Sequence, residues 1–238
     1  MTTPAVEVSG LVVERGGRTV LDGLDLEILR GRVTGLLGPS GCGKSTLIRA
    51  IAGVQVVRSG SVTVLGEPAG SAVNRRRVAY MTQASSVYPD LTVEQNLSYF
   101  ARLSAVGRDR VEAVLSAVDL GAQRGSLTRE LSGGQRARVS LAAALIAEPE
   151  VCLLDEPTVG LDPVLRRDLW RLFGGLAESG VTLLVSSHVM DEADRCDVVL
   201  LMREGRMIAQ DSPAGLRAAT GTADIESAFL ALAEGGAA

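Results

Sequence analysis

The spacing of hydrophobic positions changes along the chain and predicts different elements in turn. Near the N-terminus, Val6–Val13 and Thr19–Leu29 alternate apolar and polar residues around glycine turns, which predicts two antiparallel strands. Val33–Leu37 is a continuous apolar run that leads into a glycine-rich loop, and Ser45–Ala52 follows with a helical pattern. A buried strand, a glycine loop and a helix in this order begin a parallel α/β core.

The middle of the chain reads as helical from Leu91 to about Glu130. Thr92 and Gln95 have the spacing of a capping box at a helix N-terminus, and strand signals are few through Arg110–Leu120. We therefore expect a helical subdomain inserted into the core.

The second half of the chain returns to the α/β pattern. Two short apolar runs, Val151–Leu154 and Val181–Val185, predict strands buried on both faces. A helix is predicted before the first strand, at 136–147, and another between the two strands, at 164–178. A hairpin follows over 198–210. The prediction is a single α/β domain over 1–238, divided into a core with an antiparallel β-subdomain (1–83 and 136–210), a helical subdomain (about 84–135) and a helical tail (211–238).

Composition narrows the classes of function. The formal net charge of -4 argues against a nucleic-acid-binding protein, and we expect the short basic run Arg75–Arg77 to be a solvated turn before a strand. The chain has neither a leader-like N-terminus nor an apolar run near the ~18 residues that a membrane span needs, so we expect neither secretion nor a membrane span. The chain has three cysteines, Cys42, Cys152 and Cys196, whose spacings are unrelated. We therefore expect neither disulfides nor a cysteine metal site, as is typical of a protein in the reducing cytoplasm.

A phosphate-binding loop joins the predicted Val33–Leu37 strand to its helix. In the G-x-x-x-x-G-K-[ST] pattern, backbone N–H groups surround phosphates at a helix N-terminus, while a lysine reaches the β- and γ-phosphates and a hydroxyl binds Mg²⁺. Lys44 is the only lysine in the chain, which favours a site that needs a compact ammonium, and it excludes a guanine-binding Asn-Lys-x-Asp motif. The residues that match are Gly38, Pro39, Ser40, Gly41, Cys42, Gly43, Lys44, Ser45 and Thr46.

Cys42 lies inside this loop. We expect it to be a small residue that fits the available space, with chemical reactivity beside Lys44 as the alternative.

Two carboxylates follow the apolar run that ends at Leu154. Asp155 and Glu156 stand at the carboxyl end of a strand, the edge at which open α/β sheets bind ligands. Asp155 could hold Mg²⁺ through its water shell, and Glu156 could orient or deprotonate water for an in-line attack on the γ-phosphate. An acidic helix cap is the alternative interpretation.

A helix is also predicted after residue 131. Its N-terminus is a second possible anion-binding site, separate from the phosphate loop. Its sequence, Leu131-Ser132-Gly133-Gly134-Gln135, resembles the signature of the ATP-binding cassette (ABC) ATPases. This resemblance implies an ATP- and Mg²⁺-dependent ATPase. The fold implied is a P-loop NTPase core of mostly parallel sheet with an N-terminal antiparallel β-subdomain and an inserted α-helical subdomain.

The resemblance covers nearly the whole chain. It implies that Gln83 is the Q-loop glutamine that senses Mg²⁺ and water, that Asp162 lies in the D-loop, and that His188 is the switch histidine at the γ-phosphate. Arg15 departs from the family, which carries an adenine-stacking aromatic residue there. A guanidinium can also stack on a base, so stacking by Arg15 and an ordinary exposed loop residue both stay open.

The family resemblance also implies partners. The signature of one protomer completes the ATP site of another, so we expect a homodimer or heterodimer that closes on ATP and hydrolyses it. We expect a cytoplasmic protein, peripheral to the membrane, that drives a separate transmembrane permease, with export favoured over import. The docking face is expected at Ala84–Leu91, which contains Tyr88 and Pro89. The alternatives are a non-transport ABC ATPase that regulates a soluble partner and a P-loop phosphotransferase.

Overall fold

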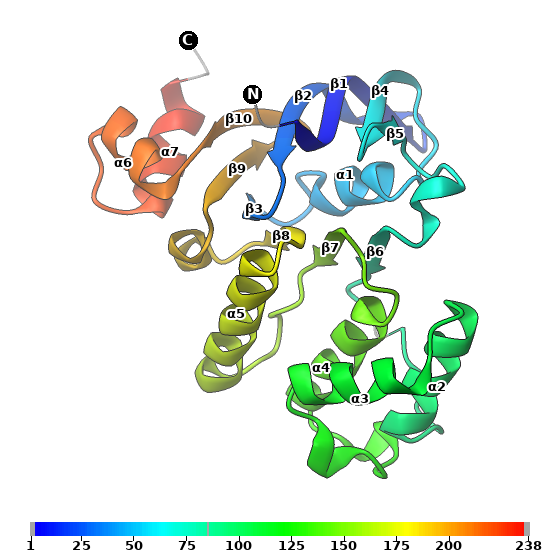
Figure 1. Ribbon diagram of the computed structural model, residues 1–238. Coiled ribbons are helices and arrows are strands. Elements are labelled where there is room, and N and C mark those ends of the chain that lie inside the picture. The colour runs from blue at the N-terminus through cyan, green and yellow to red at the C-terminus, as the bar shows by residue number, and fades with distance from the viewer. Residues whose placement is uncertain (1–2, 85, 236–238) are drawn as a thin grey trace.

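Two sheets organise the residues described in the computed structural model, which are 3–84 and 86–235 (Figure 1). Within these residues, a four-stranded antiparallel sheet has the order β2-β1-β4-β5, and a six-stranded sheet has the order β10-β9-β3-β8-β7-β6. The strands of the first sheet are β1 Pro4–Arg15, β2 Arg18–Leu29, β4 Ser59–Val64 and β5 Glu67–Pro68. Those of the second are β3 Val33–Leu37, β6 Val78–Met81, β7 Val151–Asp155, β8 Thr182–Ser187, β9 Val198–Arg203 and β10 Arg206–Asp211.

The six-stranded sheet is parallel except for its edge strand β10, which pairs antiparallel to β9. Helix α1 (Lys44–Ile51) packs between this sheet and the antiparallel one, while α5 (Pro163–Glu178) covers the opposite face (Figure 1). Alternate residues of β7 therefore enter different cores: Leu153 lies in the core with α1, and Leu154 in the core with Phe173 of α5. Burial on both faces explains the continuous apolar runs of the central strands.

A helical lobe follows β6. It contains α2 (Val93–Leu103), α3 (Arg108–Ala117) and the first turns of α4 (Gly133–Leu145), which packs against α2, α3 and β6 (Figure 1). Capping boxes begin α2 and α4: Thr92 pairs with Gln95, and Ser132 pairs with Gln135. The capping box predicted from the sequence at Thr92 is therefore confirmed.

The last two helices of the described residues are α6 (Pro213–Thr220) and α7 (Ile225–Gly235), which lie within the predicted tail over 211–238. Four short 3₁₀ helices connect larger elements in the described part of the chain: η1 Val73–Arg75, η2 Gly121–Gln123, η3 Thr128–Glu130 and η4 Met190–Arg195. Among the described residues, no helix combines the length and the apolar character that crossing a bilayer requires.

The predicted fold class is confirmed, and so are the N-terminal antiparallel strands and the strands of the core. β4 and β5 had no counterpart in the sequence prediction. α4 begins at Gly133 with Ser132 as its cap, which agrees with the prediction that Ser132 and the glycines of the signature open this helix. The division of the chain at residues 83/84 and 135/136 stays a prediction, since α4 crosses the second limit.

The basic run before β6 has two environments. Arg75 and Arg76 are exposed, as a solvated turn predicts, whereas Arg77 binds Glu150 with 2.6 Å between Nε and Oε1. The Arg77 guanidinium holds the pKa of the Glu150 carboxyl below its usual value. This ion pair links the starts of β6 and β7, so Arg77 has a structural contact that the charge pattern alone does not reveal.

Asn96 anchors the start of the helical lobe. Its side chain is fully buried, and Oδ1 accepts the N–H of Tyr88 at 2.8 Å. Its Nδ2 lies within hydrogen-bond distance of the carbonyls of Tyr88, Leu91 and Thr92 and of the Thr128 hydroxyl, at 2.9 to 3.3 Å. One amide therefore holds the segment before α2 against both α2 and η3.

We expect Asn96→Ala to lower the free energy of unfolding by about 2–4 kcal/mol, because it leaves several buried polar groups without their partner. Urea unfolding followed by circular dichroism measures this change. Ser98→Ala, at a partly exposed position of the same helix, should change it by less than about 0.5 kcal/mol. An Asn96→Ala protein as stable as wild type would contradict this role.

Candidate functional site

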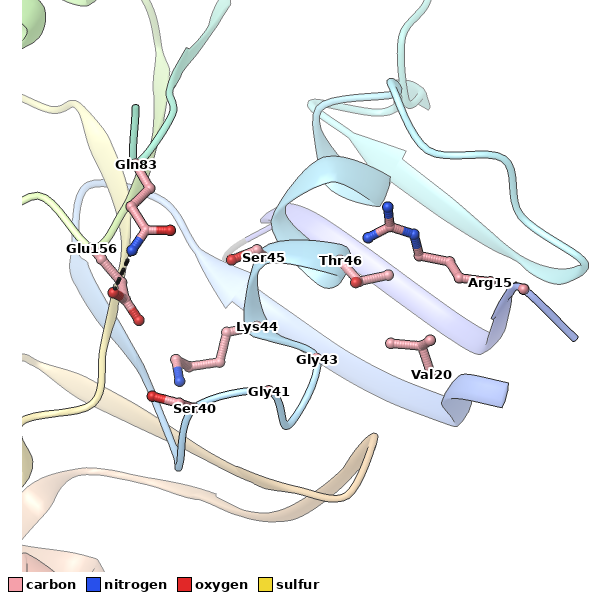
Figure 2. Close-up of a pocket in the computed structure, with 11 residues that line it drawn as sticks. Arg15, Val20, Ser40, Gly41, Gly43, Lys44, Ser45, Thr46, Gln83 and Glu156 are labelled. Atoms are coloured by element: carbon pink, nitrogen blue, oxygen red, sulfur yellow. Dashed lines mark hydrogen bonds between the residues drawn. The ribbon is translucent and has the colours of Figure 1, made fainter. Parts of the chain in front are cut away.

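A cleft of 680 Å³ lies where the phosphate loop, the end of β1 and the segments after β6 and β7 meet. Figure 2 shows Lys44, Gln83 and Glu156 on one side of this cleft and Arg15 and Val20 on the other. The structure thus brings together residues that are far apart in the sequence. The lining residues are Arg15, Gly16, Val20, Ser40, Gly41, Gly43, Lys44, Ser45, Thr46, Gln83 and Glu156.

Lys44 presents a buried ammonium at the floor of the cleft. The residue is 5% exposed, and its Nζ donates to the carbonyls of Gly38 at 2.7 Å and Pro39 at 3.0 Å. Among the described residues it forms no ion pair. A buried cation held only by neutral carbonyls is stabilised further by an anion, so this part of the cleft is electrostatically suited to phosphate.

The N-terminus of α1 faces the same space. Its cap residue is Gly43, which has φ of 112° and makes no side-chain cap, so the first N–H groups of the helix are not satisfied by a capping side chain. A side chain at Gly43 would also collide with Leu21 and Met202, whose nearest atoms lie 2.8 Å from the position of a Cβ. Because L residues with side chains rarely adopt this φ, the backbone conformation itself favours glycine at position 43.

The Asp155 carboxylate connects the phosphate loop to the sheet. It is 1% exposed, and its Oδ1 accepts hydrogen bonds from the Ser45 hydroxyl at 3.0 Å and the Ser186 hydroxyl at 2.9 Å. A carboxylate and a hydroxyl side by side are ligands that Mg²⁺ accepts. The Ser45 hydroxyl and the Asp155 carboxylate therefore fit a magnesium ion at this edge, and the amide oxygen of Gln83 is turned toward the side of Ser45 (Figure 2), so Gln83 as the third ligand stays a prediction.

Glu156 has a strained backbone. Its φ of 52° lies in the left-handed region, which is unfavourable for a residue with a side chain and is often found at functional sites. Its N–H donates to the Ser186 hydroxyl at 2.9 Å, while its Oε2 accepts from Gln83 Nε2 at 3.1 Å. His188 Nδ1 lies 3.5 Å from Oε1. The Glu156 carboxylate is thus held between Gln83 and His188.

Three adjacent strands supply this group. Gln83 follows the end of β6, Asp155 and Glu156 stand at the end of β7, and His188 follows β8. The carboxyl ends of parallel strands lie at one edge of a sheet, and the observed clustering follows from that topology. The structure adds Ser186, whose role the sequence analysis missed. The sequence shows only that polar residues end the apolar run of β8, and it is the register of the sheet that places Ser186 directly beside Asp155.

The signature residues and Asp162 do not line the cleft of their own chain. Ser132 and Gly133 are exposed at the start of α4, where Ser132 and Gln135 form the capping box, while Gly134 is buried. Asp162 caps α5, with its Oδ1 accepting from the N–H groups of the next helical turn at 2.9 and 3.0 Å. These residues therefore have structural roles within one chain and surfaces left free for another.

Cys42 and Arg15 were the two open cases. Cys42 is buried within the loop, and burial raises the pKa of its thiol despite the opposing effect of Lys44. The structure therefore supports Cys42 as a small residue that fills the available space and argues against a reactive thiol. Arg15 is exposed beside Val20 at the rim of the cleft, a position compatible with both of its interpretations.

Comparison with known proteins assigns the family. The ABC transporter family matches residues 21–159, which include the phosphate loop, the signature and the acidic pair. The chain is 39% identical over 219 residues to the Nod factor export ATP-binding protein I of Ralstonia nicotianae, covering 89% of this chain and 68% of that protein. It is 37% identical over 227 residues to the daunorubicin/doxorubicin resistance ATP-binding protein DrrA of Streptomyces peucetius, covering 92% and 69%.

Other relatives are longer. The probable multidrug ABC transporter ATP-binding protein YbhF of Escherichia coli is 37% identical over 240 residues, but the chain spans only 41% of it. Among solved structures, the ATP-binding subunit of an ABC transporter superposes with a TM-score of 0.86 at 27% identity, covering 97% of this chain and all of that one. CbiO1 of Clostridium perfringens, part of the cbiONQ complex, gives 0.83 at 30% identity, covering 90% and 91%. The chain therefore belongs to the ABC transporter family, and it is an ATP-binding, ATP-hydrolysing member of it.

Proposed function

We propose that this ATPase drives an exporter, and that two copies, or one copy and a related chain, close head to tail on ATP beneath a separate transmembrane permease. The observation that carries the proposal is the separation of two motifs. The phosphate loop lines the cleft, whereas Ser132 and Gly133 lie exposed outside it. A second protomer can place its signature across the γ-phosphate, which the chain's own signature does not reach.

The proposed chemistry follows the placement of the side chains. Lys44 and the N-terminus of α1 bind the β- and γ-phosphates, while Ser45, Asp155 and Gln83 would hold Mg²⁺. A magnesium ion held there would supply positive charge to the phosphate oxygens. Glu156 orients a water whose oxygen attacks the γ-phosphorus as the bond to the bridging oxygen of ADP breaks, and its carboxylate takes the proton. Gln83 and His188 position that carboxylate from either side.

The docking face for the permease is proposed at Ala84–Leu91, of which Ser85 lies outside the described residues. Within it Val87 is buried and Tyr88 is 47% exposed. The Tyr88 ring stacks edge to face on the exposed Tyr99 ring of α2, with 5.2 Å between centroids. Exposed aromatic rings on a rigid base are typical of protein interfaces, and Asn96 supplies that rigidity.

Export as the direction of transport is supported by the relatives, which include a drug-resistance protein and a Nod factor export protein. Such a subunit would lie in the cytoplasm, peripheral to the membrane. A second candidate is an ABC ATPase that regulates a soluble partner, because the same dimer cycle would serve it. The family match favours both over a small-molecule phosphotransferase.

We expect Glu156→Gln to lower the ATP hydrolysis rate by about 10²- to 10⁴-fold and to trap a dimer in ATP, because the base is lost while nucleotide binding is kept. Light scattering should show a mass that doubles on addition of ATP. Adding Ser132→Arg to the same protein should prevent the dimer while leaving ATP bound, since a bulky charge then blocks the exposed signature. A Glu156→Gln protein that binds ATP and remains a monomer would disprove head-to-tail closure.

We expect tagged Glu156→Gln protein with ATP to capture a polytopic membrane protein from detergent-solubilised membranes, identified by mass spectrometry. Tyr88→Asp in this background should dimerise but lose the capture, because it buries a charge at the proposed interface, whereas Tyr88→Phe should retain it. Retention of soluble proteins alone would reject the transport proposal in favour of the regulatory one.

We expect Ser186→Ala to lower the hydrolysis rate by about ten- to a hundred-fold, because Asp155 loses a hydrogen bond and the Glu156 N–H loses its acceptor. The Mg²⁺ concentration for half-maximal rate should rise, since Asp155 is then less firmly oriented. A colorimetric phosphate assay over a range of Mg²⁺ measures both. Unchanged rate and unchanged Mg²⁺ dependence would show that Ser186 does not organise the site.

A further inference from the structure

Glu192 is a buried acidic residue that the proposed reaction does not use. It lies in η4, the short helix after His188, and is 2% exposed. Its Oε2 accepts a hydrogen bond from the Thr158 hydroxyl at 3.1 Å, and Thr158 is itself 3% exposed. A carboxylate is this deeply buried only where its surroundings compensate for the loss of water, so the contact with Thr158 needs an explanation.

The hydrogen bond joins the same two chain segments that meet at the cleft. Thr158 stands two residues after Glu156, and Glu192 four residues after His188. At the surface, His188 Nδ1 lies 3.5 Å from Glu156 Oε1. Two contacts therefore span the gap between these segments, one exposed to the cleft and one buried beneath it. The buried contact is the less mobile of the two, because burial protects it from competition with water.

Arg166 of α5 contributes charge to the buried contact. Its Nε lies 3.7 Å from Glu192 Oε1, and within the described residues neither atom has a hydrogen-bond partner. Its Nη2 lies 3.4 Å from the carbonyl of Leu161, next to the D-loop residue Asp162. Arg166 thus offsets the buried negative charge and holds the carboxylate against α5 as well as against Thr158.

The same region touches the signature helix. Gly134 is buried at the start of α4, where any Cβ would overlap Leu165 Cδ1 of α5 and would lie 3.6 Å from Leu161 Cδ2. The start of α4 therefore packs directly on the turn that Arg166 contacts. Packed groups therefore connect the signature to Glu192, and η4 connects Glu192 to His188 along the chain. A displacement of the signature could be transmitted through these groups.

We propose that Glu192, with Thr158 and Arg166, is a positioning residue that sets the separation between Glu156 and His188. Its carboxylate clamps the turn after Glu156 to the segment after His188, and it places the His188 ring against the Glu156 carboxylate before any nucleotide is bound. The proposal rests on the proposed roles of Glu156 and His188, and it assigns to Glu192 no contact with substrate.

The single histidine gives a test that does not depend on turnover. His188 is the only histidine in the chain, so its imidazole resonances need no further assignment in protein from which any histidine tag has been removed. Thr158→Val keeps the shape of the side chain but removes the hydroxyl, and it should shift the His188 resonances. Thr158→Ser restores a hydroxyl and should return them toward wild type.

Thr182→Val is the matched control. Thr182 is 2% exposed, its hydroxyl accepts the Gly31 N–H at 3.1 Å, and it lies at the opposite end of β8 from His188. The same loss of a buried hydroxyl there should leave the His188 resonances unchanged. Thr158→Val should lower kcat for ATP by about ten-fold, the effect of one lost hydrogen bond to a charged group, with the Kd for ATP unchanged.

Each outcome decides one point. Unchanged resonances and kcat in Thr158→Val, or equal changes in Thr182→Val, would overturn the clamp while leaving the proposed function intact. A wild-type protein that does not hydrolyse ATP would overturn the proposed function instead, and the resonances would still report whether Thr158 positions His188. Glu192→Ala should repeat the Thr158→Val shift and lower the unfolding temperature, because it leaves the buried Nε of Arg166 without its acid. Loss of stability without that shift would reduce Glu192 to a structural role.

Discussion

The hydrogen bonds to the Asp155 carboxylate determine how the site is built. A buried carboxylate is costly unless it is paired or well hydrogen-bonded, and among the described residues Asp155 has the hydroxyls of Ser45 and Ser186. These two bonds fix the phosphate loop to β8 through the end of β7. The same carboxylate is suited to a divalent cation. The hydrogen bonds that fix Asp155 in the protein without nucleotide therefore also orient it for the magnesium–nucleotide complex.

Lys44 completes this arrangement with the opposite charge. Its ammonium and the Asp155 carboxylate are both buried near the start of α1, but each is held by neutral groups and they do not pair with each other. The cost of keeping them apart is offset by the two apolar cores on either face of the sheet. A magnesium–nucleotide complex carries both an anion and a cation, and it would stabilise both charges at once.

Local patterns explain what could be predicted from the sequence. The phosphate loop, the strand ends and the capping box at Thr92 are defined by residues within a few positions of one another, and the structure has them where expected. β4 was missed because only Val64 among its residues is fully buried. Ser186 and Glu192 were missed for a different reason: their partners lie 31 and 34 residues away, and only the register of the sheet and the packing of loops bring them together.

The start of the signature helix has an exposed part and a buried part, and together they explain how a cassette could sense its partner. Ser132 and Gly133 are exposed, while Gly134 is packed against α5. A protomer that presses on the exposed residues would therefore act on a close contact, in which the backbone of the buried Gly134 packs against the side chains of Leu165 and Leu161. That contact adjoins Leu161, whose carbonyl accepts from Arg166, and Arg166 in turn lies beside Glu192. Under the proposed dimer, binding at one ATP site would thus bear on the separation of Glu156 and His188 at the other.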